Sequence, residues 1–286
     1  MALALFYTFC CLACTAFNDL LFKYFARKER SRGIFVTFIG ITGSAAMLFL
    51  PDKLGENWQM TLFWGVICGL FSAVGNILLI ESMTNLSAGV CSTVYRMNLA
   101  LVVPFSVLIF HENLLIHQYA GVFLAIAAVL AFLPGKENKS ANDKHLWLYA
   151  AMIITASIFR AGLGLSCKYG PTTGASPNGI NLLIEIMWII TGLAYYFLKE
   201  RRHCRMDAKV IKYGIGSGIL VAGILFFMMA ALNAPGAKAS IVLPIAQMSF
   251  IVTFLLSVLL LKEKITGWKI AAMLCGAGAM ILLSWH

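Results

Sequence analysis

Four charged side chains lie within long apolar stretches of the sequence, where they could bind a charged solute: Arg96, Arg160, Asp19 and Glu185. A charge near the middle of a bilayer costs about 3 kcal/mol or more, so each one needs a partner, a water-filled cavity or a ligand. A guanidinium can clamp a carboxylate or a phosphate through two parallel hydrogen bonds, which lysine does poorly. The two carboxyl groups could pair with the arginines or act as proton carriers.

The depth of each charge along its stretch predicts how the four pair. Arg160 lies near the middle of one stretch and Glu185 lies seven residues into the next, so we expect these two to pair. By the same reasoning Asp19 pairs with Arg96. Either pair could fix helix packing or belong to a solute site. Further polar residues that could line a site, or form ordinary interhelical hydrogen bonds, are Asn18, Asn76, Tyr95, Asn98 and Gln247.

The elements that hold these residues are transmembrane helices. Apolar residues make up 60% of the chain and charged residues 12%, against about half and a quarter in a soluble domain. Stretches of about 20 apolar residues cross a bilayer as helices, because lipid leaves no other partner for the backbone. The sequence predicts an all-α membrane protein with helices at 2–25, 33–50, 59–80, 87–110, 114–133, 146–168, 178–198, 210–231, 237–261 and 266–285.

An internal repeat divides the chain into two groups of five helices. Segments 96–113 and 247–264, which begin 151 positions apart, share a methionine, the tripeptide Ser-Val-Leu and a glutamate, Glu112 or Glu263. Five crossings are an odd number, so the second copy enters the membrane the other way up. We therefore expect inverted repeats at 1–135 and 136–286, an arrangement typical of transporters. The repeat places Arg96 opposite Gln247, which makes Arg96 the stronger candidate for binding a solute.

Two features predict how the helices deviate and pack. Pro104 and Pro244 would interrupt the fourth and ninth helices and expose carbonyl groups to a solute. Small residues four positions apart predict close contacts within the chain and, as a second possibility, a homodimer surface; they are Gly65 and Gly69, Gly214 and Gly218, and Ala272 and Gly276.

Lysine and arginine are concentrated on one side of the expected membrane. The connections after the first, fifth, seventh and ninth helices hold 17 of the 22, and the opposite connections hold three. Because cytoplasmic loops are enriched in these residues, we expect a multi-pass protein of the cell membrane with both termini outside the cytoplasm. The net charge of +10 then reflects contact with lipid headgroups and not with nucleic acid.

The sequence argues against an enzyme and against a bound cofactor or metal. No GxxxxGK motif followed by Ser or Thr occurs, and all five histidines fall at helix ends or in loops. Cys11 and Cys14 form a CxxC, but they lie in an apolar helix without histidine partners or a second pair. A membrane enzyme or a receptor-like binding protein therefore stays the weaker hypothesis.

Together these features resemble the drug/metabolite transporter superfamily, particularly its bacterial EamA-type members. The resemblance covers nearly the whole chain, and its most specific residues are His111-Glu112-Asn113 with Tyr119-Ala120-Gly121, and Lys262-Glu263-Lys264 with Trp268-Lys269. It implies a secondary transporter with a cavity lined by helices 1, 3, 4, 6, 8 and 9. Members are usually drawn with cytosolic termini, and the loop charges of this chain predict the reverse.

The function predicted from the sequence is transport of a small organic metabolite by alternating access. We expect an anion or a zwitterion such as an amino acid, held by Arg96. The alternative is a proton-driven exporter of cationic drugs that uses Glu185 or Asp19 as the proton carrier. The expected partners are the solute and membrane lipids.

Overall fold

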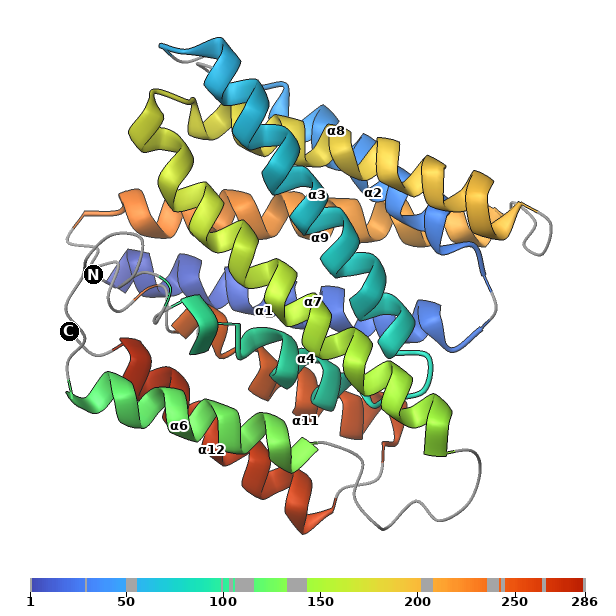
Figure 1. The fold of residues 1–286 in the computed structure, drawn as a ribbon, viewed down its shortest axis with the longest axis vertical. Helices are drawn as coiled ribbons and strands as arrows, with labels where there is room; N and C mark the ends of the chain where they lie inside the picture. Colours follow the sequence, from blue (N-terminus) through green and yellow to red (C-terminus); the bar gives the residue numbers. More distant parts are fainter. Residues whose placement is uncertain are drawn as a thin grey trace.

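Helices account for the fold, and their order follows the apolar stretches. The computed structural model describes residues 2–28, 30–49, 56–98, 100–102, 105, 116–132, 143–201, 208–235, 242, 245–263 and 266–284. These residues contain ten α-helices and no strand (Figure 1): α1 (Ala2–Ala26), α2 (Arg32–Met47), α3 (Trp58–Ser82), α4 (Ala88–Arg96), α6 (Ile116–Phe132), α7 (Asp143–Tyr169), α8 (Pro177–Tyr195), α9 (Ala208–Asn233), α11 (Ser249–Leu261) and α12 (Gly267–Ser284). A 3-10 turn (Gly170–Thr173) follows α7, and a π-helical turn (Tyr196–Glu200) follows α8.

Several of these helices have the length and composition of membrane spans. Within the described residues, five are long and apolar enough to cross a membrane: Ala2–Ala26, Trp58–Ser82, Trp147–Thr173, Pro177–Glu200 and Ala208–Met228. Shorter apolar helices are Arg32–Met47, Ile116–Ala128, Ile245–Leu261 and Gly267–Leu283. The predicted all-α protein with membrane-length helices is confirmed at this level.

Side-chain caps begin four of the helices. Ser31, Asn57, Ser87 and Ser176 each accept a hydrogen bond from the backbone N–H three residues further on, at the starts of α2, α3, α4 and α8. The first N–H groups of a helix have no partner inside the helix, so these caps satisfy donors that lipid cannot. Glu200 adds a second cap on α2, because its carboxylate accepts from the N–H groups of Arg32 and Gly33 at 2.8 and 3.0 Å.

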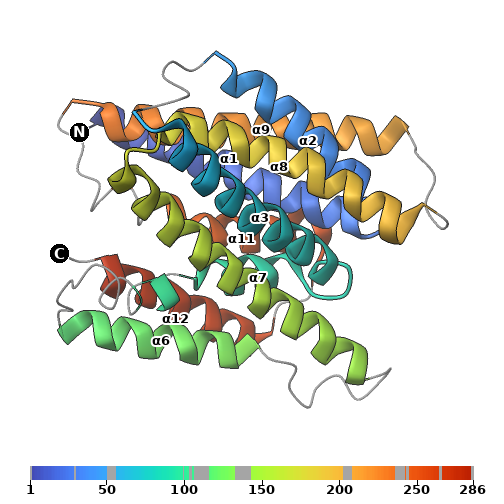
Figure 2. The same ribbon diagram turned by 45° about the horizontal axis from the view of Figure 1, so that its top comes forward.

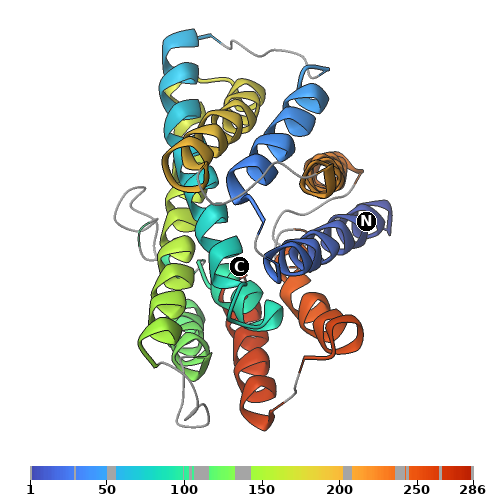
Figure 3. The same cartoon turned by 90° about the vertical axis from the view of Figure 1, so that its right-hand side faces the viewer.

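The helices pack in pairs that cross the boundary between the two halves of the chain. The helix α1 lies along α9, α2 lies on α8 and α9, and α3 lies on α7 and α8. Figure 3 views α9 almost end-on beside α1 and α2. Figure 2 shows α6 and α12 side by side at one edge of the bundle, and α4 and α11 lie between this pair and the rest. The largest buried apolar cluster joins residues of α1, α2, α3 and α4 to residues of α7, α8 and α9.

Small residues allow the closest of these contacts. A methyl group added at Gly65 or Gly69 would come within 2.4 Å of side-chain atoms of Leu183 or Met187, so α3 and α8 touch there almost backbone to side chain. At Gly218 of α9 the same test meets Thr42 of α2 at 2.5 Å. The predicted small-residue contacts at these positions are therefore made within the chain.

The fourth and ninth helices are interrupted at methionines, so α4 covers only the first part of the predicted span 87–110. The helix α4 ends at Arg96, and Met97 has φ −70° and ψ 2°. In the ninth helix Met248 has φ −69° and ψ 4°, just before α11 begins. Pro104 and Pro244, the predicted sites of interruption, lie outside the described residues, as do Glu112 and the repeated Ser-Val-Leu at 106–108.

Both breaks share two hydrogen bonds that span three residues, although the N–H of Met97 also keeps a four-residue bond to the carbonyl of Thr93 at 3.1 Å. The N–H of Met97 donates to Val94 and that of Met248 to Ile245, at 3.2 and 3.1 Å. Three residues beyond each methionine, the N–H donates back to its carbonyl, at 2.9 Å in the first break and 3.0 Å in the second. Bonds that span three residues instead of four overwind the helix locally, which is the physical reason for the breaks.

Candidate functional site

A cavity of about 410 Å³ lies between the helices near the α4 break. It is lined from α1, α3, α4, α7, α8 and α9, and by Gln247, which precedes α11. The contribution of α8, the seventh helix in chain order, was not among those that the family resemblance implied. The cavity brings together all nine residues singled out in the sequence: Asn18, Asp19, Asn76, Tyr95, Arg96, Asn98, Arg160, Glu185 and Gln247.

Arg96 and Asp19 form the predicted ion pair, which is thereby confirmed. The Nη2 atom of Arg96 lies 3.6 Å from Oδ2 of Asp19, and both side chains are buried. The same oxygen accepts hydrogen bonds from the hydroxyls of Ser92 at 2.6 Å and Thr253 at 3.3 Å. Helices α1, α4 and α11 thus meet at one carboxylate, and this carboxylate neutralises the charge of Arg96.

Arg96 also contacts its counterpart in the repeat. Its Nη1 atom donates to Oε1 of Gln247 at 3.5 Å, and the two residues are 151 positions apart. The Nε atom of Arg96 is buried and has no hydrogen-bond partner within the part of the chain that the structure describes. Two nitrogens of Arg96 are thus engaged, and the third is buried without a partner.

The predicted pair between Arg160 and Glu185 is wrong, although both residues line the cavity. The guanidinium of Arg160 lies 5.7 Å from the centre of the Tyr95 ring, a cation–π distance. The carboxylate of Glu185 is buried against Gly43 of α2, and its Oε2 atom has no hydrogen-bond partner among the described residues. The reason is rotational: α7 turns Arg160 toward α4, whereas α8 turns Glu185 toward α2.

The amides of the lining are held by neighbouring hydroxyls and carbonyls. Asn18 of α1 accepts a hydrogen bond from Ser217 of α9 at 2.6 Å, which is the interhelical role that the sequence left open. Asn76 donates to the carbonyl of Ser72 on its own helix at 2.8 Å. The indole of Trp188 donates to the Ser72 hydroxyl at 2.9 Å and so links α8 to α3. These amides position the wall of the cavity.

Several lining residues were missed by sequence reasoning. Trp188 and Phe22 count as apolar, so they gave no sign of facing a cavity. Asn181 and Ser72 are polar residues inside apolar stretches, and the criterion that selected Asn76 could have found them.

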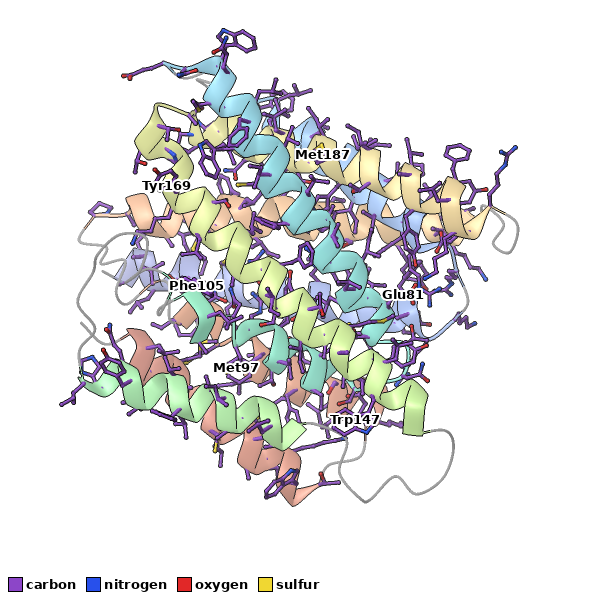
Figure 4. All side chains as sticks on the ribbon, viewed as in Figure 1. Glu81, Met97, Phe105, Trp147, Tyr169 and Met187 are labelled. Carbon is purple, nitrogen blue, oxygen red and sulfur yellow. The ribbon has the colours of Figure 1, made fainter. Side chains whose placement is uncertain are left out.

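Polar contacts tie the helix ends together on the side of the basic connections. Lys23 donates to the carbonyls of Met83 and Leu86 at 2.6 Å each, across the turn between α3 and α4. The carboxylate of Glu263 accepts from the first N–H of α4 at 3.1 Å. In Figure 4 Glu81 lies at the same end of the bundle, where it pairs with Arg32 at 3.3 Å. These contacts join α1, α2, α3 and α4 and the residue Glu263 at this end of the bundle.

The chain is similar to known proteins in sequence over its first half and in fold over nearly its whole length. Residues 2–133 match the model of the EamA-like transporter family. This family is part of the drug/metabolite transporter superfamily, so the first half of the chain is similar to a half of such a transporter. A solved structure described only as "Crystal structure of protein" is similar in fold, with a TM-score of 0.65 and 13% identity over 98% of this chain and 95% of that one. No curated protein matches the chain.

The family match indicates a broad class of function. The EamA-like match together with the membrane-length helices indicates a membrane transporter. The cavity is of the size that proteins use to bind small molecules.

Proposed function

We propose that the protein is a secondary transporter that moves a small organic anion or zwitterion across the cell membrane by alternating access. The observation that carries this proposal is the cavity between the two halves of the chain, with two arginines in its wall. An anionic group is recognised well by guanidinium donors in a site that excludes water. The family supplies the transport function, and the wall of the cavity supplies the charge of the solute.

Alternating access follows from the proposed inverted repeats, at 1–135 and 136–286. Three features support this relation. The packing of α1 on α9 has its counterpart in the packing of α7 on α3, as an exchange of halves requires. The breaks at Met97 and Met248 share two hydrogen bonds that span three residues. Arg96 and Gln247, at equivalent positions, touch each other as residues beside a twofold axis do.

The structure redistributes the roles of the two arginines. Arg96 is already neutralised by Asp19, so it can add a donor to the site but little net charge. Arg160 faces the Tyr95 ring and has no carboxylate within ion-pair distance in the described part of the chain. We therefore assign Arg160 as the main anion-binding residue, with Arg96 beside it.

We further propose that the termini lie outside the cytoplasm. Helix α1 begins and α12 ends at the same end of the bundle, opposite the end of α1 and the start of α2 (Figure 1). Lys23 and Arg32 make their polar contacts at this second end, because they lie in the last turn of α1 and at the start of α2. The excess of lysine and arginine in the connections at that second end supports placing it in the cytoplasm.

Transport by purified protein in liposomes tests the function. Counterflow of labelled amino acids and organic acids should be seen with the natural chain and be lost or strongly reduced in Arg160→Gln and Arg96→Gln. Lys168→Gln is a matched control, because it removes a positive charge from α7 at a position that does not line the cavity. Normal transport by both arginine variants would refute the assigned roles, and absence of any flux would refute the transport of these solutes.

One observation favours a second candidate, proton-driven export of cations. Glu185 is a buried carboxyl group without a hydrogen-bond partner at Oε2, and such a group is a natural proton carrier. Under this alternative, efflux of a cationic dye from liposomes would require an inward proton gradient. The requirement would disappear together with transport in Glu185→Gln, whereas Glu56→Gln, at an exposed position before α3, would behave as the natural chain.

A further inference from the structure

The charges around the cavity do not all find partners within the protein. Among the described lining residues four are charged: Asp19, Arg96, Arg160 and Glu185. Asp19 and Arg96 neutralise each other at 3.6 Å. One positive and one negative side chain, Arg160 and Glu185, are left, and they do not pair with each other.

Of the two side chains, Glu185 has the greater need of a partner, because it is the more deeply buried. The residue is 3% exposed, and its Oε2 atom would clash with a methyl group added at Gly43. An ionised carboxylate held this deep without a partner costs several kcal/mol, so it must meet a proton or a cation. Because Glu185 lines the cavity, a cation that enters the cavity can reach it.

Arg160 offers the opposite charge from the neighbouring helix. It is half-buried, and its contact with Tyr95 engages only part of a guanidinium that carries five N–H donors. A carboxylate that enters the cavity can bind these donors in two parallel hydrogen bonds. The α9 side of the cavity is apolar, formed by Val221, Ile224 and Leu225.

We propose that the transported solute is a zwitterion, with its carboxylate on Arg160, its ammonium on Glu185 and its apolar body against α9. This inference rests on the proposed transport function and narrows it to one class of solute, small amino-acid-like molecules. Bound together, the two charges of the solute neutralise both unpaired charges of the cavity, whereas a simple anion or cation leaves one of them buried and unpaired.

Binding of charge-blocked analogues tests the proposal. The probes are the standard amino acids, β-alanine and γ-aminobutyrate, followed by the N-acetyl derivative and the amide of whichever binds best to the detergent-purified chain. Both derivatives should bind about tenfold more weakly or worse, because each leaves one charged partner unsatisfied. In Glu185→Gln the penalty for N-acetylation should vanish while the penalty for the amide remains. In Arg160→Gln the pattern should reverse.

A variant that keeps both charges gives an independent check. Gly43→Ala inserts a methyl group where the Glu185 carboxylate lies, so it displaces that carboxylate without changing any charge. It should reduce the penalty for N-acetylation and leave the penalty for the amide unchanged. Size-exclusion profiles and melting curves identify any variant that fails to fold, and Glu185→Asp should restore part of the preference lost in Glu185→Gln.

The outcomes separate this inference from the proposed function. Equal or tighter binding of the N-acetyl derivative would overturn the zwitterion and leave an anion transporter. Equal or tighter binding of the amide would overturn it in favour of a cation transporter with Glu185 as the proton carrier. If none of the probes binds while simple organic acids are transported in liposomes, the inference fails and the proposed function stands. If nothing binds and nothing is transported, the proposed function itself fails.

Discussion

Replacing Asp19 by asparagine should destabilise the protein, because it leaves the buried charge of Arg96 without an ion-pair partner. The side chain keeps its size, so the hydroxyls of Ser92 and Thr253 retain a neighbour at 2.6 and 3.3 Å. Arg96, 3.6 Å away, loses its only ion-pair partner among the described residues. Removing one member of a buried pair costs about 3–5 kcal/mol. For a chain of this length the melting temperature should fall by roughly 10 °C.

A double-mutant cycle tests whether Asp19 and Arg96 stabilise each other. Arg96→Gln alone leaves Asp19 buried and unpaired, so it should also be destabilising. Asp19→Asn with Arg96→Gln removes both charges and should cost less than the sum of the single changes, by about 1 kcal/mol or more. Melting curves of the detergent-purified variants, followed by tryptophan fluorescence, measure all four corners of the cycle. Strict additivity would show that the two side chains do not stabilise each other.

Three further predictions rest on other contacts. The Sγ atoms of Cys68 and Cys167 lie 3.7 Å apart, so diamide should remove two maleimide-reactive thiols from the natural chain but none beyond background from Cys68→Ser; unchanged thiol counts would contradict this contact of α3 with α7. Glu200→Gln weakens the cap on α2 and should cost about 1–3 kcal/mol of stability, and an unchanged melting temperature would show that the cap is dispensable. Gly69→Leu should prevent folding, seen as aggregation on size exclusion, because Met187 already occupies the space; a normal profile would place α8 elsewhere.

The sequence was sufficient to find the helices and the residues around the cavity. Ser31, Asn57, Ser87 and Ser176 mark where helices begin, and the predicted starts at 33, 59, 87 and 178 fall within one residue of α2, α3, α4 and α8. Polar residues that lipid excludes must face the interior, so selecting them by depth in apolar stretches also selects the lining of an internal cavity. Whether these residues bind a solute is a separate question, which the proposed variants address.

The contacts among the lining residues could not be predicted in the same way. Depth along a helix says how far a residue lies from the membrane surface, but not which neighbour its side chain faces. Arg160 and Glu185 were matched by depth, and yet the rotations of α7 and α8 direct them to Tyr95 and Gly43. The breaks at Met97 and Met248 could not be predicted from the sequence either. A local change of hydrogen bonds needs no proline or glycine to mark it.

The proposed twofold relation explains why the unpaired charges lie away from the centre of the bundle. At such an axis equivalent residues meet, so a repeat with arginine in both copies would bring two like charges together and cost several kcal/mol in a medium of low polarity. Gln247 in the second copy turns that repulsion into a hydrogen bond with Arg96, and Asp19 neutralises the charge that remains. The charge of Arg96 is then satisfied by other residues of the protein and needs no solute. Arg160 and Glu185 belong to α7 and α8 of the second half, and they are the charges that a solute can still satisfy. Departure from exact symmetry is thus what gives this cavity a charge pattern of its own.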